Sequence, residues 1–309
     1  MPLLHPSREL SLLLAGAVLA VSGCECFGAT VVYDKTMLLD EELYDESVPV
    51  DQQCAELCMQ AGTNTVQSCV LTAIDGEPAV SCEVLATQDC GGIGRRPAGL
   101  APAIATAARG ALARHFSAAA HVEAASVPAF ETMARELAAH GAPRALRRRA
   151  LRAAREEARH TSAVAALARR YGGTLVHPIV KRQPVRPLED VALENAVEGC
   201  VRETSGAAVA RWQSLHAASP DLRRTLRRIA DDETRHAALS WDVHRWARQR
   251  LTTPSVRRIE RRGAEVAASL RDGGREPDPT VRRVAGMPSR AARTQIDGRL
   301  WDTLWEAWS

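Results

Sequence analysis

The strongest constraint on this chain is a short charged pattern that occurs twice. The segment EEARH places Glu157 three residues before His160, and the segment DDETRH places Glu233 three residues before His236. Residues three apart lie on one face of an α-helix, so each pair can direct a carboxylate and an imidazole at the same point. A solvated charged face would explain one such segment but not its repetition. We therefore interpret the two pairs as ligands of a metal site.

The residues around these pairs predict a mainly α-helical fold. Aromatic residues make up only 4% of the chain, and alanine, leucine and arginine are abundant, which favours helix over sheet. Gly141 and Pro143 predict one short connection between helices, and Ser219 and Pro220 predict another. A longer proline-containing stretch separates the second helix from the third. The expected helices span about residues 102–140, 143–171, 189–218 and 220–251.

Two short connections and one long connection resemble the connectivity of ferritin-like four-helix bundles. A two-metal site in such a bundle takes one glutamate from each of two helices and a Glu-x-x-His pair from each of the other two. Antiparallel pairing around the first short connection puts Glu123 level with Glu157 and His160. In the third helix, pairing around the second connection points to Glu203, whereas Glu198 reproduces the spacing of the first half. We predict Glu198 as the ligand, with Glu203 as an alternative or additional one.

The complete set resembles the ligands of ferritin-like di-iron carboxylate proteins. The segments EAASVPAF, EEARH, ENAVEGCVRET and DDETRH further resemble ferritin-like domains that follow lipoprotein signals in some bacteria, a group whose function is uncharacterised. The likeness covers about residues 100–250. It implies two iron ions, with manganese or a mixed manganese and iron centre as alternatives. The predicted ligands are Glu123, Glu157, His160, Glu198, Glu233 and His236.

An acid directly precedes the glutamate of each pair. Histidine ligands normally donate their other ring N–H to a carboxylate, which fixes the tautomer. The order acid, Glu, x, Arg, His resembles the pattern of oxygen-activating di-iron enzymes, in which the preceding acid supports a histidine across the site. The resemblance implies this role for Asp232 and Glu156.

The first residues predict an export signal. The apolar run of residues 11–21 is too short to span a bilayer as a helix. It leads into VSGC, which resembles the lipobox of bacterial lipoproteins and implies a lipid on Cys24. An ordinary secretory signal is the alternative. We expect a protein of the bacterial cell envelope that is held to the membrane by lipid, on the periplasmic or outer-membrane face.

Residues 24–96 predict a separate acidic module. They contain 13 acidic and three basic residues, whereas the chain from residue 97 onward contains 23 acidic and 36 basic ones. An even number of cysteines in a short exported segment predicts a disulfide framework, with a zinc site as the alternative. Cys200, alone in the later part, is expected to be buried. The cysteines predicted to form disulfides are Cys26, Cys54, Cys58, Cys69, Cys82 and Cys90.

The last segment, residues 253–309, predicts a helical C-terminal extension. Its end, LWDTLWEAWS, carries an apolar stripe with three tryptophans, Trp301, Trp305 and Trp308. The stripe is expected to pack on the bundle as a lid, and a membrane-interface anchor is the alternative.

These features predict four parts: a lipoprotein-type signal (1–23), the acidic module (24–96), a ferritin-like bundle (97–252) and the extension (253–309). The expected function is a di-iron oxidase or oxygenase that activates dioxygen for an unknown small substrate. Non-enzymatic iron binding and oxidation is one alternative. A surface interaction lipoprotein with a structural metal site is another. Nucleic acid is not an expected partner, because basic residues are not interleaved with aromatic ones.

Overall fold

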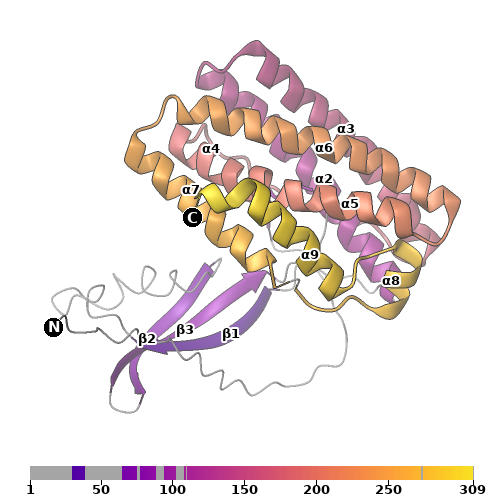
Figure 1. Cartoon of the computed structure of the whole chain (residues 1–309), viewed down its shortest axis with the longest axis horizontal. Coiled ribbons are helices and arrows are strands. Elements are labelled where there is room, and N and C mark those ends of the chain that lie inside the picture. Colours follow the sequence, from indigo (N-terminus) through magenta and orange to yellow (C-terminus); the bar gives the residue numbers. More distant parts are fainter. Residues whose placement is uncertain are drawn as a thin grey trace, which may run out of the picture. The chain divides into compact units, whose positions relative to one another are not determined.

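The computed structural model describes residues 30–38, 65–74, 77–87, 94–101, 108, 110–272 and 274–308. The predicted signal segment and the predicted lipidation site, Cys24, lie outside these residues. The chain divides into two compact units with a boundary between Gln88 and Asp89. Each unit is described by itself. The described residues are mainly helical, as the sequence predicts (Figure 1).

The first unit contains a three-stranded antiparallel sheet, which the sequence analysis did not predict. The strands are arranged in the order β1-β3-β2. They are rich in valine and threonine, which favour extended backbone. Cys69, on β2, is disulfide-bonded. The side chains of the other cysteines predicted to form disulfides lie outside the described residues. The strands are β1 (Thr30–Leu38), β2 (Thr65–Ile74) and β3 (Glu77–Thr87).

The second unit is built on long helices that lie side by side (Figure 1). Helices α2 and α3 pack together along their length, α5 packs on α6, and α3 also contacts α6. The third predicted helix is present as a continuous helical run, but its middle part is a π-helix, η1. This arrangement is compatible with a ferritin-like fold. The elements are α2 (Ala111–Ala139), α3 (Arg144–Arg170), α4 (Leu188–Glu194), η1 (Asn195–Glu203), α5 (Thr204–His216) and α6 (Pro220–Arg248).

The connections between these helices follow from local sequence. Gly141 takes a positive φ of 69° after α2, a conformation that costs glycine little. Ser219 caps α6 by accepting a hydrogen bond from the backbone N–H of Leu222, and Pro220 occupies the first turn. A proline there loses no helical hydrogen bond, because the first N–H groups have no intrahelical partner.

The π-helix η1 is the main departure from the predicted third helix. Its i to i+5 hydrogen bonds widen the turn, and such segments often occur at functional sites. Gly199, within η1, lies against α6, where an added Cβ would come 2.4 Å from Ser240 Oγ. The close approach of these two helices therefore depends on a glycine at position 199.

Two apolar clusters of the second unit lie along its long helices, and a third surrounds Trp305. One contains Phe116 of α2 and Ile229 of α6, and the other contains Phe130 of α2 and Leu239 of α6. Many of the remaining core residues are alanines, which let the helix backbones approach closely. On both helices the two clusters are separated by ten residues, from Ala120 to Phe130 and from Ile229 to Leu239, which is nearly three turns. The predicted ligands Glu123, Glu233 and His236 lie in these intervals.

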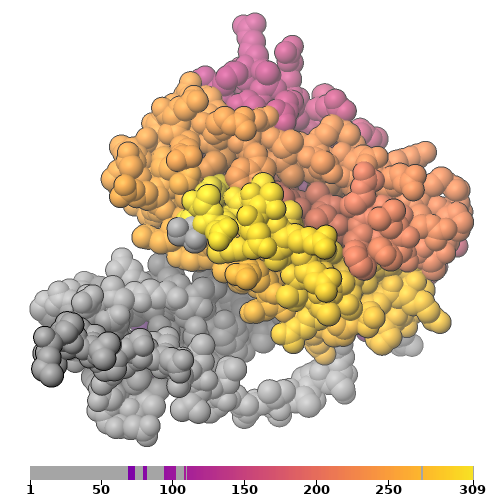
Figure 2. Space-filling view, in the orientation of Figure 1, coloured from indigo at the N-terminus to yellow at the C-terminus, as the bar shows by residue number. Residues whose placement is uncertain are grey.

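The C-terminal extension packs on the same unit, as the lid prediction expects. Figure 2 shows its last part (yellow) lying against the salmon helix α5 and against its own first helix (orange), which in turn contacts the third helical run. Trp305 is fully buried, and its indole N–H donates to the backbone oxygen of Cys200 at 3.2 Å. Cys200 is itself buried and unbridged. The elements are α7 (Thr253–Leu270), α8 (Pro279–Ala285), α9 (Arg290–Leu300), η2 (Trp301–Trp305) and η3 (Glu306–Trp308).

Among the helices that the structure describes, none has both the length and the apolar character needed to cross a bilayer.

The burial of Trp305 predicts that the extension contributes strongly to stability. Trp305→Ala should lower the free energy of unfolding by about 3–5 kcal/mol, because it removes a large buried side chain and leaves a cavity. Urea denaturation followed by circular dichroism measures the change. Leu215→Ala is the control, since Leu215 is 60% exposed, and it should change the value by less than about 0.5 kcal/mol. Equal effects of the two changes would contradict the described packing.

Candidate metal centre

A group of acidic and histidine side chains lies buried between the two apolar clusters. Glu123 comes from α2, Glu157 and His160 come from α3, and Glu233 comes from α6. Each of these offers one ligand atom within 4.8 Å of the others, and all four side chains are buried. The group could therefore hold a metal ion.

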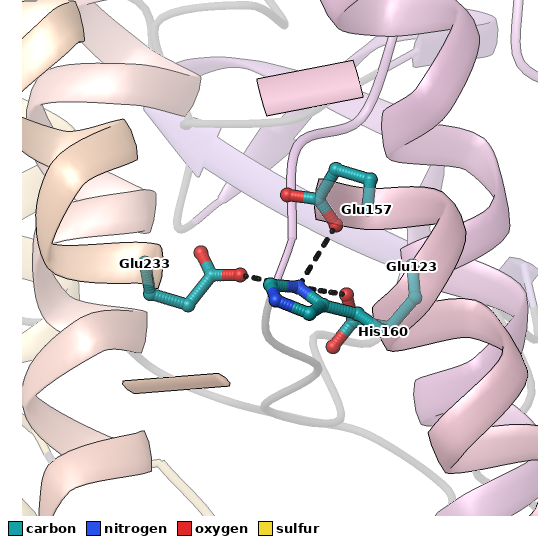
Figure 3. Close-up of side chains that lie close together, drawn as sticks. All are labelled: Glu123, Glu157, His160 and Glu233. Carbon is teal, nitrogen blue, oxygen red and sulfur yellow. Dashed lines mark ion pairs between the residues drawn. The ribbon is translucent and has the colours of Figure 1, made fainter. Parts of the chain in front are cut away.

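Three carboxylates surround one ring nitrogen of His160 (Figure 3). Nδ1 of His160 lies 3.4 Å from Glu123 Oε2, 3.6 Å from Glu157 Oε2 and 3.3 Å from Glu233 Oε1. Figure 3 shows Glu233 entering from the side opposite Glu123 and His160. One N–H cannot satisfy three acceptors, so the carboxylates exceed what the imidazole can neutralise.

His236 faces the other oxygens of two of the same carboxylates. Its Nδ1 lies 3.0 Å from Glu157 Oε1 and 3.6 Å from Glu233 Oε2. Glu157 and Glu233 therefore each place one oxygen beside His160 and the other beside His236. The ring of Phe130 packs on His236, with centroids 5.0 Å apart. The two carboxylates thus link two halves of one cluster.

The outer nitrogen of each histidine contacts an acid from the opposite helix. His160, on α3, has Nε2 3.1 Å from Asp232 Oδ2 of α6. His236, on α6, has Nε2 3.0 Å from Glu156 Oε2 of α3. With each Nε2 carrying the proton and donating it to its acid, each Nδ1 would present its lone pair to the cluster. Asp232 and Glu156 thus each contact the histidine of the opposite helix, as the resemblance to di-iron enzymes implies. That they orient these histidines for a metal stays a prediction.

The two candidate acids of the third helix have different surroundings. Glu203 is fully buried, accepts a hydrogen bond from Ser240 Oγ at 2.8 Å through Oε2, and is acted on by the charges of His236 and Glu233. Glu198 is 14% exposed, with Oε1 3.3 Å from Arg202 Nε. Its Oε2 accepts from a backbone N–H at 3.3 Å. The structure thus brings Glu203 to the cluster, while Glu198 has partners elsewhere.

The inner atoms of the cluster have no hydrogen-bond partner. Buried polar atoms are paired in the great majority of cases, and an unpaired buried charge is costly. The eight atoms gathered here are Glu123 Oε2, Glu157 Oε1 and Oε2, His160 Nδ1, Glu203 Oε1, Glu233 Oε1 and Oε2, and His236 Nδ1.

Electrostatics show that the cluster requires positive charge. Burial alone would lower the pKa of His160, but its contacts with Glu123, Glu157 and Glu233 raise that pKa to about 12. The pKa of His236 is likewise raised well above its usual range, against the effect of burial. Burial and the charge of Glu157 raise the pKa of Glu123 well above its usual range. A divalent cation would supply the charge that protons otherwise provide.

The donor set is consistent with particular metals. Carboxylate oxygens together with imidazole nitrogens suit iron and manganese, whereas soft metals prefer thiolates. Cys200 lies on η1, but it is buried and burial raises its pKa well above the usual range of a thiol, so it is a poor candidate for a thiolate ligand. The residues present therefore fit a hard or borderline divalent ion.

Comparison with known proteins finds no family model, no curated protein and no solved structure that matches this chain. The geometry of the cluster is therefore the basis on which a function is inferred.

Two residues beside the cluster were missed by the sequence analysis. Arg95 is 1% exposed and contacts the cluster, although its glycine- and proline-rich surroundings predict a linker. No periodic pattern marks it. Ser240, which holds Glu203, lies seven residues after Glu233 on the same face of α6. That spacing of two helical turns is a signal that could have identified it.

The surplus of negative charge makes a prediction about the chelator-treated protein. His160→Ala should lower the free energy of unfolding by about 3–5 kcal/mol, because it removes the imidazole whose charge offsets that of the three buried carboxylates around it. Glu123→Gln should cost much less, since it removes one of the repelling charges. Urea denaturation of both variants measures the difference.

The difference between wild type and His160→Ala should also depend on pH. The pKa of His160 is about 12 in the folded protein and 6.5 in the unfolded chain. Protonated His160 therefore stabilises the folded state fully below pH 6.5, and this stabilisation is lost as the pH rises towards about 12. The gap should therefore narrow between pH 6 and pH 9. A gap that widens over this range would contradict the described charge distribution.

Proposed function

We propose that this chain is a ferritin-like di-metal protein of the bacterial cell envelope, with iron as the metal, and that it uses dioxygen to oxidise a small substrate. The observation that carries the proposal is the set of unpaired buried atoms, because it divides into two equal groups. His160 Nδ1 is grouped with Glu123 Oε2, Glu157 Oε2 and Glu233 Oε1. His236 Nδ1 is grouped with Glu157 Oε1 and Glu233 Oε2, and we assign Glu203 Oε1 to the same group because the charge of His236 acts on Glu203 and Ser240 bonds to both residues.

Each group supplies four donor atoms from the chain, and Glu157 and Glu233 belong to both. In this proposal these two carboxylates would be shared by two metal ions, while Glu123 and Glu203 would each hold one. Ferritin-like di-iron and di-manganese proteins use the same kind of ligand set: one glutamate from each of two helices and a Glu-x-x-His pair from each of the other two. The proposed set replaces Glu198 with Glu203, because Glu203 has an unpaired oxygen beside the cluster.

Two neighbouring ferrous ions would supply two electrons for the reduction of dioxygen. The remaining roles belong to side chains. Asp232 and Glu156 keep the outer proton of each imidazole on Nε2, so that Nδ1 stays available for a metal. Phe130 covers His236, and the ligand side chains are at most 4% exposed, which keeps bulk water away.

The envelope location and the lipid anchor are proposed from the sequence alone. They rest on the apolar run before VSGC and on the cysteine-rich segment that follows it. Both agree with a compartment in which disulfides form. The substrate is proposed to be a small molecule that enters from outside the cytosol.

Metal content tests the proposal. We expect about two iron ions per chain after anaerobic ferrous loading, measured by mass spectrometry, and loss of both in the His160→Ala and His236→Ala double variant. Loaded protein mixed with dioxygen should show rapid ferrous oxidation in stopped-flow absorption. Oxidation that ends at two irons per chain supports an oxidase, whereas continued uptake of iron would indicate storage.

His244→Ala is the matched control. His244 is also buried on α6, but its Nε2 contacts Glu260 at 3.3 Å rather than the cluster. This variant should keep both irons. Less than about a tenth of an equivalent of any transition metal in the wild-type protein would exclude the proposed two-metal site, since a functional site of this type fills when its ligands are deprotonated.

The choice of ligand in the third helix makes a separate prediction. Glu203→Gln should lower the bound metal to about one ion per chain, because it removes a negatively charged donor from the His236 group. Glu198→Gln should leave two ions bound, since its partners are Arg202 and a backbone N–H. Metal analysis of the two variants under identical loading decides the assignment, and the reverse result would restore Glu198 as the ligand.

A further inference from the structure

The two halves of the cluster differ in one buried charge. Arg95 lies beside the His236 half, with Nη1 3.8 Å from Glu203 Oε2. The guanidinium is 1% exposed. Among the described residues, no lysine or arginine contacts Glu123, the corresponding acid of the His160 half; its one polar contact is His160 Nδ1.

Arg95 is fixed in this position by its own backbone and by its neighbours. Its N–H donates to Ser126 Oγ of α2 at 2.7 Å. Both terminal nitrogens lie 3.4 Å from Asn195 Oδ1, and the guanidinium carbon is 5.8 Å from the centre of the Phe130 ring. Gly94 before it has a φ of 122° and leaves no room for a Cβ against Ser126. The arginine is therefore held in place and does not depend on the cluster for its position.

The anchoring of Glu203 limits what this carboxylate can offer a metal. Ser240 donates to Oε2 at 2.8 Å, and Arg95 also lies nearest to that oxygen. Only Oε1 is left unpaired, so Glu203 is set to give one oxygen. Glu123 carries no such anchor. The two single carboxylates are therefore unequal as ligands.

The charge of Arg95 acts in the same direction. A buried cation next to a ligand carboxylate repels a metal ion, and the effect is strong where water is excluded. Glu194 offsets part of this charge through a contact of 3.7 Å to Nη2, but it is shared with Arg186 at 2.5 Å. The cationic nitrogen nearest the cluster is Nη1, which faces Glu203.

We propose that the two metal positions have unequal affinity, and that Arg95 is the positioning residue that makes the His236 position the weaker one. The inference rests on the proposed two-metal site and adds an order of filling to it. The His160 position fills first, at least about tenfold more tightly, which is about 1.4 kcal/mol. The chain can then exist with one ion bound, and the His236 position fills when more metal is present.

Titration of the full chain with Co²⁺ in mild detergent, without oxygen, tests this order through the visible absorption of the bound ion. We expect two steps with dissociation constants at least about tenfold apart. His160→Ala should remove the tighter step, and His236→Ala should remove the weaker one. Two equal steps, or loss of the tighter step in His236→Ala, would overturn the inference. Absence of any Co²⁺ binding would instead contradict the proposed two-metal site.

Variants of Arg95 separate its charge from a purely structural role. Arg95→Gln should tighten the weaker step at least about fivefold and shift the absorption of the second ion, while the first step stays unchanged. Arg95→Lys keeps the charge and should keep the wild-type separation. Equal separation in all three proteins would exclude Arg95 as the cause. If Arg95→Gln does not fold, the Co²⁺ titrations of the wild type, His160→Ala and His236→Ala still decide the order in which the two positions fill.

Discussion

The crossed contacts of Glu157 and Glu233 with both histidines are the interaction on which the second unit depends. Each carboxylate reaches His160 with one oxygen and His236 with the other. Such contacts require α3 and α6 to lie level and close, with little tolerance for sliding. Burying several carboxylates together is costly, because their repulsion is not screened by water. The alanine-rich apolar clusters on either side supply the burial that offsets this cost, and a bound cation would stabilise the folded state further.

The outer contacts of the cluster follow the same crossed pattern. Asp232 of α6 holds His160 of α3, and Glu156 of α3 holds His236 of α6. Exposed arginines lie beyond both acids, with Arg235 contacting Glu156 at 3.0 Å. These arginines are about half exposed, so solvent screens most of their effect on the charge of the cluster. The contacts around α3 and α6 are thus nearly symmetric, and neither histidine is favoured by them.

The sequence predicted those parts of the site that follow from helical periodicity. The repeated Glu-x-x-His spacing identified Glu157, His160, Glu233 and His236, and pairing across a short turn identified Glu123. Both arguments assume 3.6 residues per turn. In the third helix the two arguments disagreed, because pairing around the second connection pointed to Glu203 and the spacing of the first half pointed to Glu198. The spacing argument assumes a regular helix, whereas η1, which contains both acids, is a π-helix with a wider turn. Arg95 was not predicted, because it reaches the site from an irregular segment without a periodic pattern. The β-sheet was not predicted, because the segment that forms it was interpreted only through its cysteines, as a disulfide framework.

The departures from symmetry all concern the third helical run. The π-helix lies there, and Gly199 within it permits contact with both Ser240 and Arg95. Trp305 of the extension bonds to the backbone of Cys200 in the same segment. Two parts of the chain outside the four long helical patterns, the segment before α2 and the C-terminal end, therefore converge on η1. The sequences flanking the helices thus contact η1 beside Glu203, whereas the contacts of Glu157 and Glu233 with the two histidines involve α3 and α6 alone.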